Sequence, residues 1–92
     1  MNVKQRDDGL KGEFYIADKG EILAQMTYVW AGDSRFIIDH TEVSDALRGQ
    51  GAGKLMLAQA VAFAREKGVK ILPLCPFAKS VFDKTPDYSD LL

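Results

Sequence analysis

Residues 46–56 read ALRGQGAGKLM and place three glycines within five positions, flanked by an arginine and a lysine (Arg48, Gly49, Gly51, Gly53 and Lys54). An apolar run rich in alanine and leucine follows at once, and glycine is among the poorest helix formers. Glycines at the start of a helix therefore point to a special role for its first turn. Three interpretations compete: a nucleotide-phosphate loop, a coenzyme-binding loop, and a plain turn between a strand and a helix.

The composition of the whole chain narrows the class of protein. Its 92 residues are 47% hydrophobic and 27% charged, which is typical of one folded domain over residues 1–92. A net charge of −1 indicates no general attraction to nucleic acid or to a membrane surface. The single cysteine, Cys75, allows no internal disulfide, and no apolar run is long enough to span a bilayer. We therefore expect a cytoplasmic protein.

The first half of the chain reads as strands separated by turn signals, such as Asp8-Gly9 and Asp18-Lys19-Gly20. Such short turns force antiparallel pairing, so these strands predict a meander. The expected strands are Val3 to Arg6, Glu13 to Ala17, Ile22 to Trp30 and Arg35 to Val43. In the third strand the alternating apolar residues share one face (Ile22, Ala24, Met26, Tyr28 and Trp30). In the fourth, Phe36 and Ile38 share a face and His40 is next in line.

In the second half of the chain, the spacing of apolar residues changes from that of strands to that of a helix. Residues 54–67 predict a helix that ends at Gly68 and lies against the sheet. A short buried strand follows at Val69 to Leu74, so a parallel pair with a right-handed crossover is expected. Pro76 suits the first turn of a second helix at Phe77 to Asp83, and the tail after Pro86 is a docked turn or loose coil. The fold class is therefore α+β.

The glycine cluster fails both common nucleotide motifs. The ATP or GTP loop requires a glycine where Arg48 stands and a hydroxyl where Leu55 stands. The dinucleotide motif requires a glycine at Lys54 or at Met56. Two interpretations remain: glycines that allow close packing, or a cradle of free amides at a helix N-terminus for a pyrophosphate. The flanking cations Arg48 and Lys54 favour the cradle.

Residues Arg48 to Gly53 match the [RQ]-x-x-G-x-[GA] signature of the GNAT superfamily of acetyl-CoA-dependent N-acetyltransferases. With His40-Thr41-Glu42-Val43 before the loop and Leu74-Cys75-Pro76-Phe77 after the next strand, the chain resembles the short, stand-alone YjdJ-type branch. The resemblance implies a GNAT-like fold in a single minimal N-acetyltransferase domain, with acetyl-CoA as its cofactor.

The resemblance also implies a binding site for coenzyme A. The loop amides and cations are expected to hold its pyrophosphate (Arg48, Gly49, Gln50, Gly51, Ala52, Gly53 and Lys54). The strands on either side of the helix are expected to splay and admit the pantetheine arm, with the thioester near Val43 and Cys75. The Val43 amide is then a donor to the thioester oxygen.

Amine attack on a thioester benefits from a base, because a lysine-type amine has a pKa of about 10.4. His40 and Glu42, which share a face of their strand, are the candidates, although His40 also suits a structural hydrogen bond and Glu42 a solvated position. Cys75 is either a small buried hydrophobe or a thiol activated at a helix N-terminus. As a nucleophile it would carry the acetyl group, but we expect direct transfer from thioester to amine.

The function expected from the sequence is acetyl transfer to a primary amine, on a small molecule or a peptide. The alternative is a protein that binds coenzyme A without turnover, as an acyl-CoA sensor or interaction module. A homodimer would complete a small acceptor pocket, and the sequence leaves that question open. No metal-ligand set is apparent, and no basic patch accompanies the aromatic residues, so nucleic acid is not an expected partner.

Overall fold

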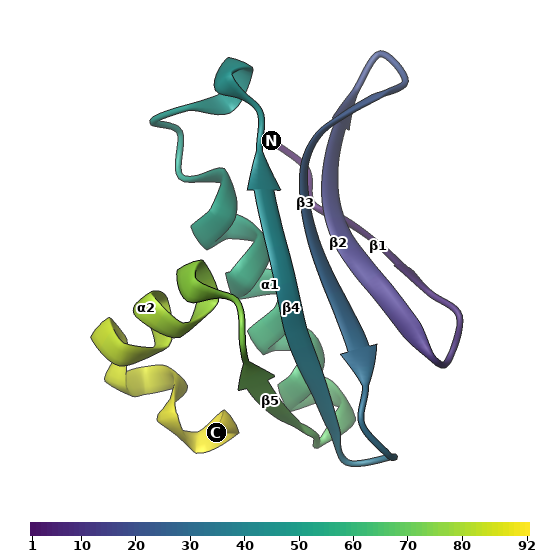
Figure 1. The fold of residues 1–92 in the computed structure, drawn as a ribbon, viewed down its shortest axis with the longest axis vertical. Helices are drawn as coiled ribbons and strands as arrows, with labels where there is room; N and C mark the ends of the chain where they lie inside the picture. The colour runs from purple at the N-terminus through teal and green to yellow at the C-terminus, as the bar shows by residue number, and fades with distance from the viewer.

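The computed structural model describes residues 1–92 and contains one five-stranded sheet in the order β1-β2-β3-β4-β5. The first four strands pair antiparallel, and β5 pairs parallel to β4, which confirms the meander followed by a β-α-β unit. Helix α1 covers one face of the sheet, and α2 lies at the β5 edge (Figure 1). The strands are β1 (Lys4–Asp7), β2 (Lys11–Asp18), β3 (Glu21–Trp30), β4 (Arg35–Val43) and β5 (Lys70–Pro73).

The faces of β3 follow the predicted alternation except at one end. Ala24, Met26 and Tyr28 are buried and Trp30 packs against the core. Ile22 is 42% exposed, so it does not share the buried face of the other residues as predicted. The register between β2 and β3 shifts next to this position, and the β2–β3 hairpin extends past the N-terminal end of α1 (Figure 1). Ile22 therefore has no helix to pack against.

A bulge in β4 overturns a second expectation. Tyr28 pairs with Ile38 and Thr27 pairs with His40, which leaves Asp39 as an extra residue. Because one inserted residue reverses the alternation of all that follow, His40 does not continue the face of Ile38. Thr41 takes the helix-side position instead, and His40 lies on the opposite face, which no helix covers. We call that open side the outer face.

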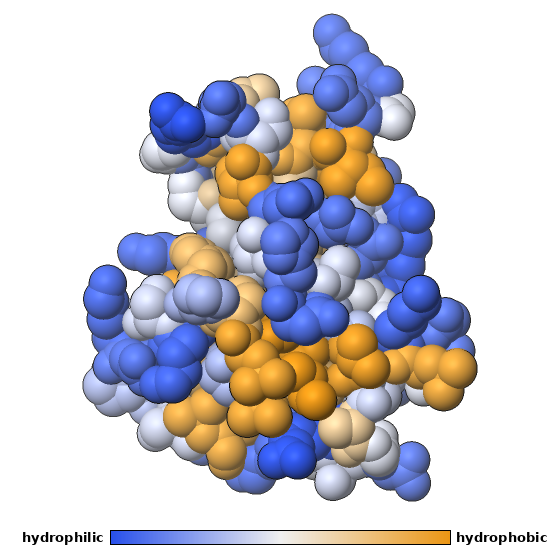
Figure 2. All heavy atoms as spheres, viewed as in Figure 1, coloured by the Kyte–Doolittle hydropathy of each residue, from blue (hydrophilic) through white to orange (hydrophobic).

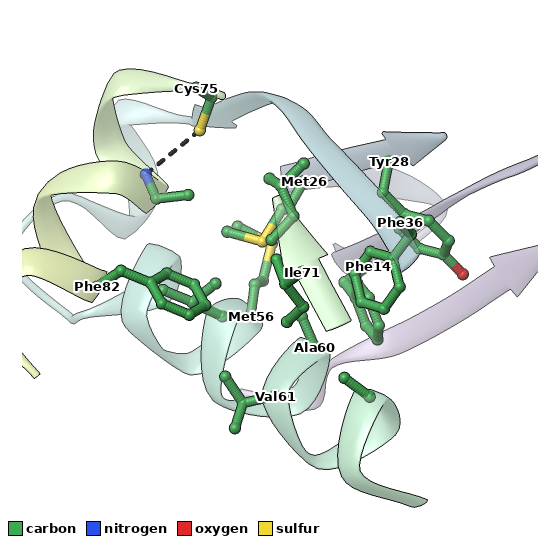
Figure 3. Packing of buried hydrophobic residues seen from close by; sticks show 14 of the residues in the cluster. Phe14, Met26, Tyr28, Phe36, Met56, Ala60, Val61, Ile71, Cys75 and Phe82 are labelled. Carbon is green, nitrogen blue, oxygen red and sulfur yellow. Dashed lines mark hydrogen bonds between the residues drawn. The ribbon is translucent and has the colours of Figure 1, made fainter. Parts of the chain in front are cut away.

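Helix α1 spans Ala52–Lys67 and begins two residues before the expected start at Lys54. At its other end Gly68 has a φ of 70° and donates to the carbonyls of Ala64 and Arg65, as expected for a glycine that ends a helix. The buried side of α1 packs on Met26 and Ile71 of the sheet through an apolar stripe (Figure 3). That stripe consists of Met56, Leu57, Ala60, Val61 and Ala64. Burial of these side chains holds the helix to the sheet.

The C-terminal third is tightly docked. Helix α2 spans Pro76–Lys84, with Pro76 in its first turn, and a 3₁₀-helix, η2, spans Pro86–Leu91. Leu91 is buried, and Arg65 of α1 bonds both the Asp87 carbonyl and the Asp90 carboxylate. The hydrogen bond from Arg65 lowers the pKa of Asp90. The tail is thus a docked element and not loose coil.

Gly12 in β2 lies where no side chain fits. A Cβ at this position would be 2.5 Å from both the Arg6 carbonyl oxygen and the Tyr28 ring. The Tyr28 hydroxyl donates to Asp7 and accepts from Gln5, and burial followed by the Asp7 bond raises its pKa. Close approach of three strands therefore depends on this glycine.

We expect Gly12→Ala to lower the free energy of unfolding by about 2–3 kcal/mol through overpacking. The control is Gly9→Ala, which has open space and a φ of 89° and costs only backbone strain of about 1 kcal/mol. Urea titration of both variants measures the difference. Equal losses in the two variants would show that β1 and Tyr28 yield without cost.

Candidate functional site

The parallel pairing of β4 with β5 ends halfway along β4. Its last register pair is Ile38 with Pro73, and the amides of Leu74 and Cys75 both donate to the Ile38 carbonyl. The chain after β5 then turns into α2, while β4 continues to Val43 (Figure 1). Residues 39–43 therefore form an edge that lacks a strand partner on the β5 side. The splay of these two strands that the family resemblance implied is present.

The direction of the edge amides follows from the ladder with β3. Ser44 donates to Leu23, so this opposed pair is a hydrogen-bonded one. Hydrogen-bonded and non-bonded pairs alternate in an antiparallel ladder. In the register of β4 with β3, Thr41 and Val43 then fall at non-bonded positions. Their backbone N–H and C=O groups consequently point away from β3, toward the open edge.

A cradle of amides adjoins the end of this edge. Gly51 precedes α1 in a left-handed conformation, with a φ of 73°, and no side chain caps the helix. A pocket of about 430 Å³ is lined by Val43, the loop glycines and the first residues of α1. The backbone N–H groups without a protein acceptor in this loop are those of Gly49, Gly51, Ala52, Gly53 and Lys54. Because α1 also presents its positive end here, the pocket suits an anion.

Two loop residues, Gly53 and Gln50, make packing or hydrogen-bond contacts within the protein. A Cβ on Gly53 would lie 2.6 Å from the ring of Phe77, so this glycine is required for packing of α1 against α2. The close-packing interpretation therefore holds for Gly53. The Gln50 amide donates to Leu47 and its side chain reaches the Ala46 carbonyl, at 3.4 Å. Gln50 thus faces the preceding 3₁₀-turn, η1 (Asp45–Leu47), and does not line the pocket.

The two cations of the loop differ in their present partners. Arg48 forms an exposed ion pair with Asp45 at 2.6 Å. Lys54 lines the pocket, is exposed and makes no ion pair within the chain. Exposed ion pairs contribute little stability, so Arg48 can exchange Asp45 for another anion at small cost.

Cys75 lies at the N-terminus of α2 and is 4% exposed. Its sulfur accepts a hydrogen bond from the Ala78 amide at 3.3 Å (Figure 3) and lies 3.2 Å from the Thr41 hydroxyl. The buried position fits the interpretation as a small hydrophobe, yet the thiol also caps a helix beside the open edge. Thr41, which the sequence did not single out, contacts Cys75 from β4.

His40 and Glu42 form a pair on the outer face, with His40 Nε2 3.1 Å from Glu42 Oε1. Their side chains are 60% and 69% exposed, respectively. The bulge at Asp39 places both of them on the side of β4 opposite Thr41. The sequence-predicted residues therefore form three groups: His40 with Glu42 on the outer face, Cys75 on the helix side, and the loop cradle next to Val43. The open edge of β4 adjoins all three.

Comparisons with known proteins identify the family and the fold. The family model described as GCN5-related N-acetyl-transferase matches residues 13–91. The chain belongs to this family, and its α+β fold is the GNAT fold. A solved relative is a GCN5-like protein from Staphylococcus aureus, described as a proposed N-acetyltransferase. It is 41% identical, covers 98% of this chain and 85% of its own length, and superimposes with a TM-score of 0.77.

More distant structures share the fold. Nourseothricin acetyltransferase is 28% identical over 71% of this chain and 40% of its own, with a TM-score of 0.56. The aminoglycoside N-acetyltransferase AAC(6')-Iy, solved in complex with CoA, covers 90% of this chain and 88% of its own with a TM-score of 0.66. Its identity is 9%, which shows the fold alone. No curated protein matches the chain significantly. No helix has the length and apolar character that a membrane crossing requires.

Proposed function

We propose that this chain transfers the acetyl group of acetyl-CoA to a primary amine on a small molecule or a peptide. The observation that carries the proposal is the run of loop amides without protein acceptors, next to an open strand edge, in a member of an acetyltransferase family. Buried backbone donors are nearly always satisfied, and Ala52 and Gly53 are buried residues. A diphosphate supplies the oxygens that such donors require.

The residues for donor binding follow from their position along this edge. The amides of Gly49, Gly51, Ala52 and Gly53 bind the diphosphate oxygens, and Lys54 and Arg48 add charge from the pocket rim. Gln50 contributes to donor binding only by holding the turn that precedes the loop amides. The Val43 N–H and C=O, which point to the open edge, pair with the amides of the pantetheine arm as a neighbouring strand would. Bound acetyl-CoA supplies an activated thioester.

The reacting carbonyl belongs near Thr41 and Cys75, because these residues meet where the open edge narrows toward β5. The Thr41 amide donates to the carbonyl oxygen that gains negative charge during attack, whereas Val43 serves the arm nearer the loop. Cys75 lines the cleft beside the sulfur. The buried, helix-capping position of Cys75 favours this lining role over a covalent one.

The amine approaches from the outer face, where His40 and Glu42 are accessible to solvent. His40 Nδ1 takes a proton from the amine, and Glu42 orients the ring by accepting from His40 Nε2–H across their contact of 3.1 Å. The amine nitrogen forms a bond to the acetyl carbon, and the carbon–sulfur bond then breaks. The leaving thiolate takes up a proton, so the products are an acetamide and free coenzyme A.

An assay of thiol release from acetyl-CoA with a panel of amines and polyamines tests this function. We expect release that depends on the added amine, with acetylated product detected by mass spectrometry. Cys75→Ala is expected to retain coenzyme binding. If thiol is released without an added amine, this variant distinguishes hydrolysis of acetyl-CoA from acetylation of Cys75. A mass increase of the wild-type chain that this variant lacks indicates acetylation of Cys75.

Binding without release identifies the alternative function, a coenzyme A sensor or interaction module. The absence of both binding and thiol release at millimolar acetyl-CoA would contradict both functions. Calorimetry with coenzyme A distinguishes these two outcomes, because it reports binding independently of turnover.

A further inference from the structure

The outer face carries an uncovered apolar row across three strands. Val29 pairs with Ile37, and Ile37 pairs with Leu72, so their side chains lie side by side. Val29 is 40% exposed, and Leu74 beside the row is 61% exposed. Figure 2 shows apolar side chains gathered on this face of the molecule, with polar groups on either side. Apolar surface rimmed by polar groups in this way is typical of interaction sites.

Opposite charges flank the row on β4. Arg35 lies two residues before Ile37 and Asp39 lies two residues after it. Arg35 forms no ion pair within the chain, and Asp39 is exposed and accepts only the Thr27 hydroxyl. The face is therefore positive on one side of the row and negative on the other.

From this arrangement we propose that the outer face binds a second copy of the chain. A two-fold axis in the interface, parallel to the apolar row, places Ile37 against Ile37 of the second copy. The same rotation inverts the strand direction, so Arg35 of each copy faces Asp39 of the other, and the two contacts are equivalent. At the β2 end of the row, Lys11 pairs with Val29 and therefore meets Lys11 of the second copy, with the neighbouring carboxylates of Asp8 and Glu13 beside it in each copy.

The dimer leaves the loop cradle accessible, because Val43 and the glycine loop lie beyond the contacts between Arg35 and Asp39. His40 follows Asp39 directly on the same face and therefore stands at the rim of the interface. The inference does not depend on the proposed acetyl transfer. Because only part of the sheet face overlaps, the interface falls below the standard size of roughly 800 Å² per partner, and association should depend on concentration.

Charge reversal tests the axis directly. Sedimentation equilibrium of the wild-type chain over a series of protein concentrations is expected to show both monomer and dimer. Arg35→Asp and Asp39→Arg, each alone, should raise the dimer dissociation constant roughly tenfold or more, because each creates two like-charge contacts. The double variant restores opposite charges and should return the dissociation constant to near the wild-type value. Lys84→Glu, on the exposed end of α2, is the control reversal and should change nothing.

A wild-type chain that remains monomeric at every concentration would overturn the proposal. So would a dimer that the single reversals leave intact, since that dimer uses another surface. Failure of the double variant to recover would also exclude this axis. Thermal unfolding of each variant confirms that the fold is retained, which exposed positions on β4 permit.

Discussion

Replacement of His40 by glutamine is expected to lower the turnover number for acetyl transfer by roughly 100- to 10,000-fold, the range typical of general-base catalysis. The affinity for coenzyme A should be unchanged, because His40 lies on the outer face and the cradle lies beyond Val43. Stability should also be unchanged, since the side chain is 60% exposed and its only close partner is Glu42. Steady-state kinetics with a saturating amine measures the turnover number.

The pH dependence separates a base from a structural residue. Acceptor amines lose their proton in solution near pH 10, where a protein base is no longer needed. The deficit of His40→Gln should therefore shrink as the pH rises toward 10. Glu42→Gln is the matched control on the same face, and its smaller deficit reflects an orienting role. A deficit in His40→Gln that is equal at all pH values, or absent, would contradict the assignment.

The sequence predicted the layout of the fold because the signals that determine it are local. Turn signals such as Asp18-Lys19-Gly20 mark where the chain reverses between strands, and β4 has the predicted limits Arg35 and Val43. The alanine-rich period of α1 and the C-terminal Gly68 act within one helix. The family signature at Arg48 to Gly53 adds the position of the loop relative to that helix. Such features require no knowledge of distant contacts.

The parts that the sequence missed depend on contacts between segments far apart in the chain. No residue type marks the bulge at Asp39, so the face of His40 was predicted wrongly and Thr41 was overlooked. The contact between Thr41 and Cys75 joins residues 34 positions apart. The role of Gly53 depends likewise on the ring of Phe77, which only the packing of α2 brings to α1. The periodicity of apolar residues carries no information about such contacts between distant segments.

A single methyl group at Gly51 is expected to weaken coenzyme A binding by roughly 10- to 100-fold, the value of one or two hydrogen bonds to a charged group. No protein atom lies within 4 Å of a Cβ built at this position, so the methyl group of Gly51→Ala enters open space at the mouth of the pocket. There it separates the neighbouring amides from the diphosphate. Calorimetric titration with coenzyme A measures the loss of affinity.

The left-handed backbone at Gly51 also predicts a stability cost, which must be separated from the binding effect. Alanine in this conformation costs about 1 kcal/mol, and a β-branched valine costs more, so Gly51→Val is the less informative variant. Gly20→Ala is the matched control: its φ of 80° resembles the 73° of Gly51, and it too faces open space, but in the β2–β3 turn. Both variants should lose similar stability, and only Gly51→Ala should lose affinity. If the two bind coenzyme A equally well, the amides that open α1 do not hold the diphosphate.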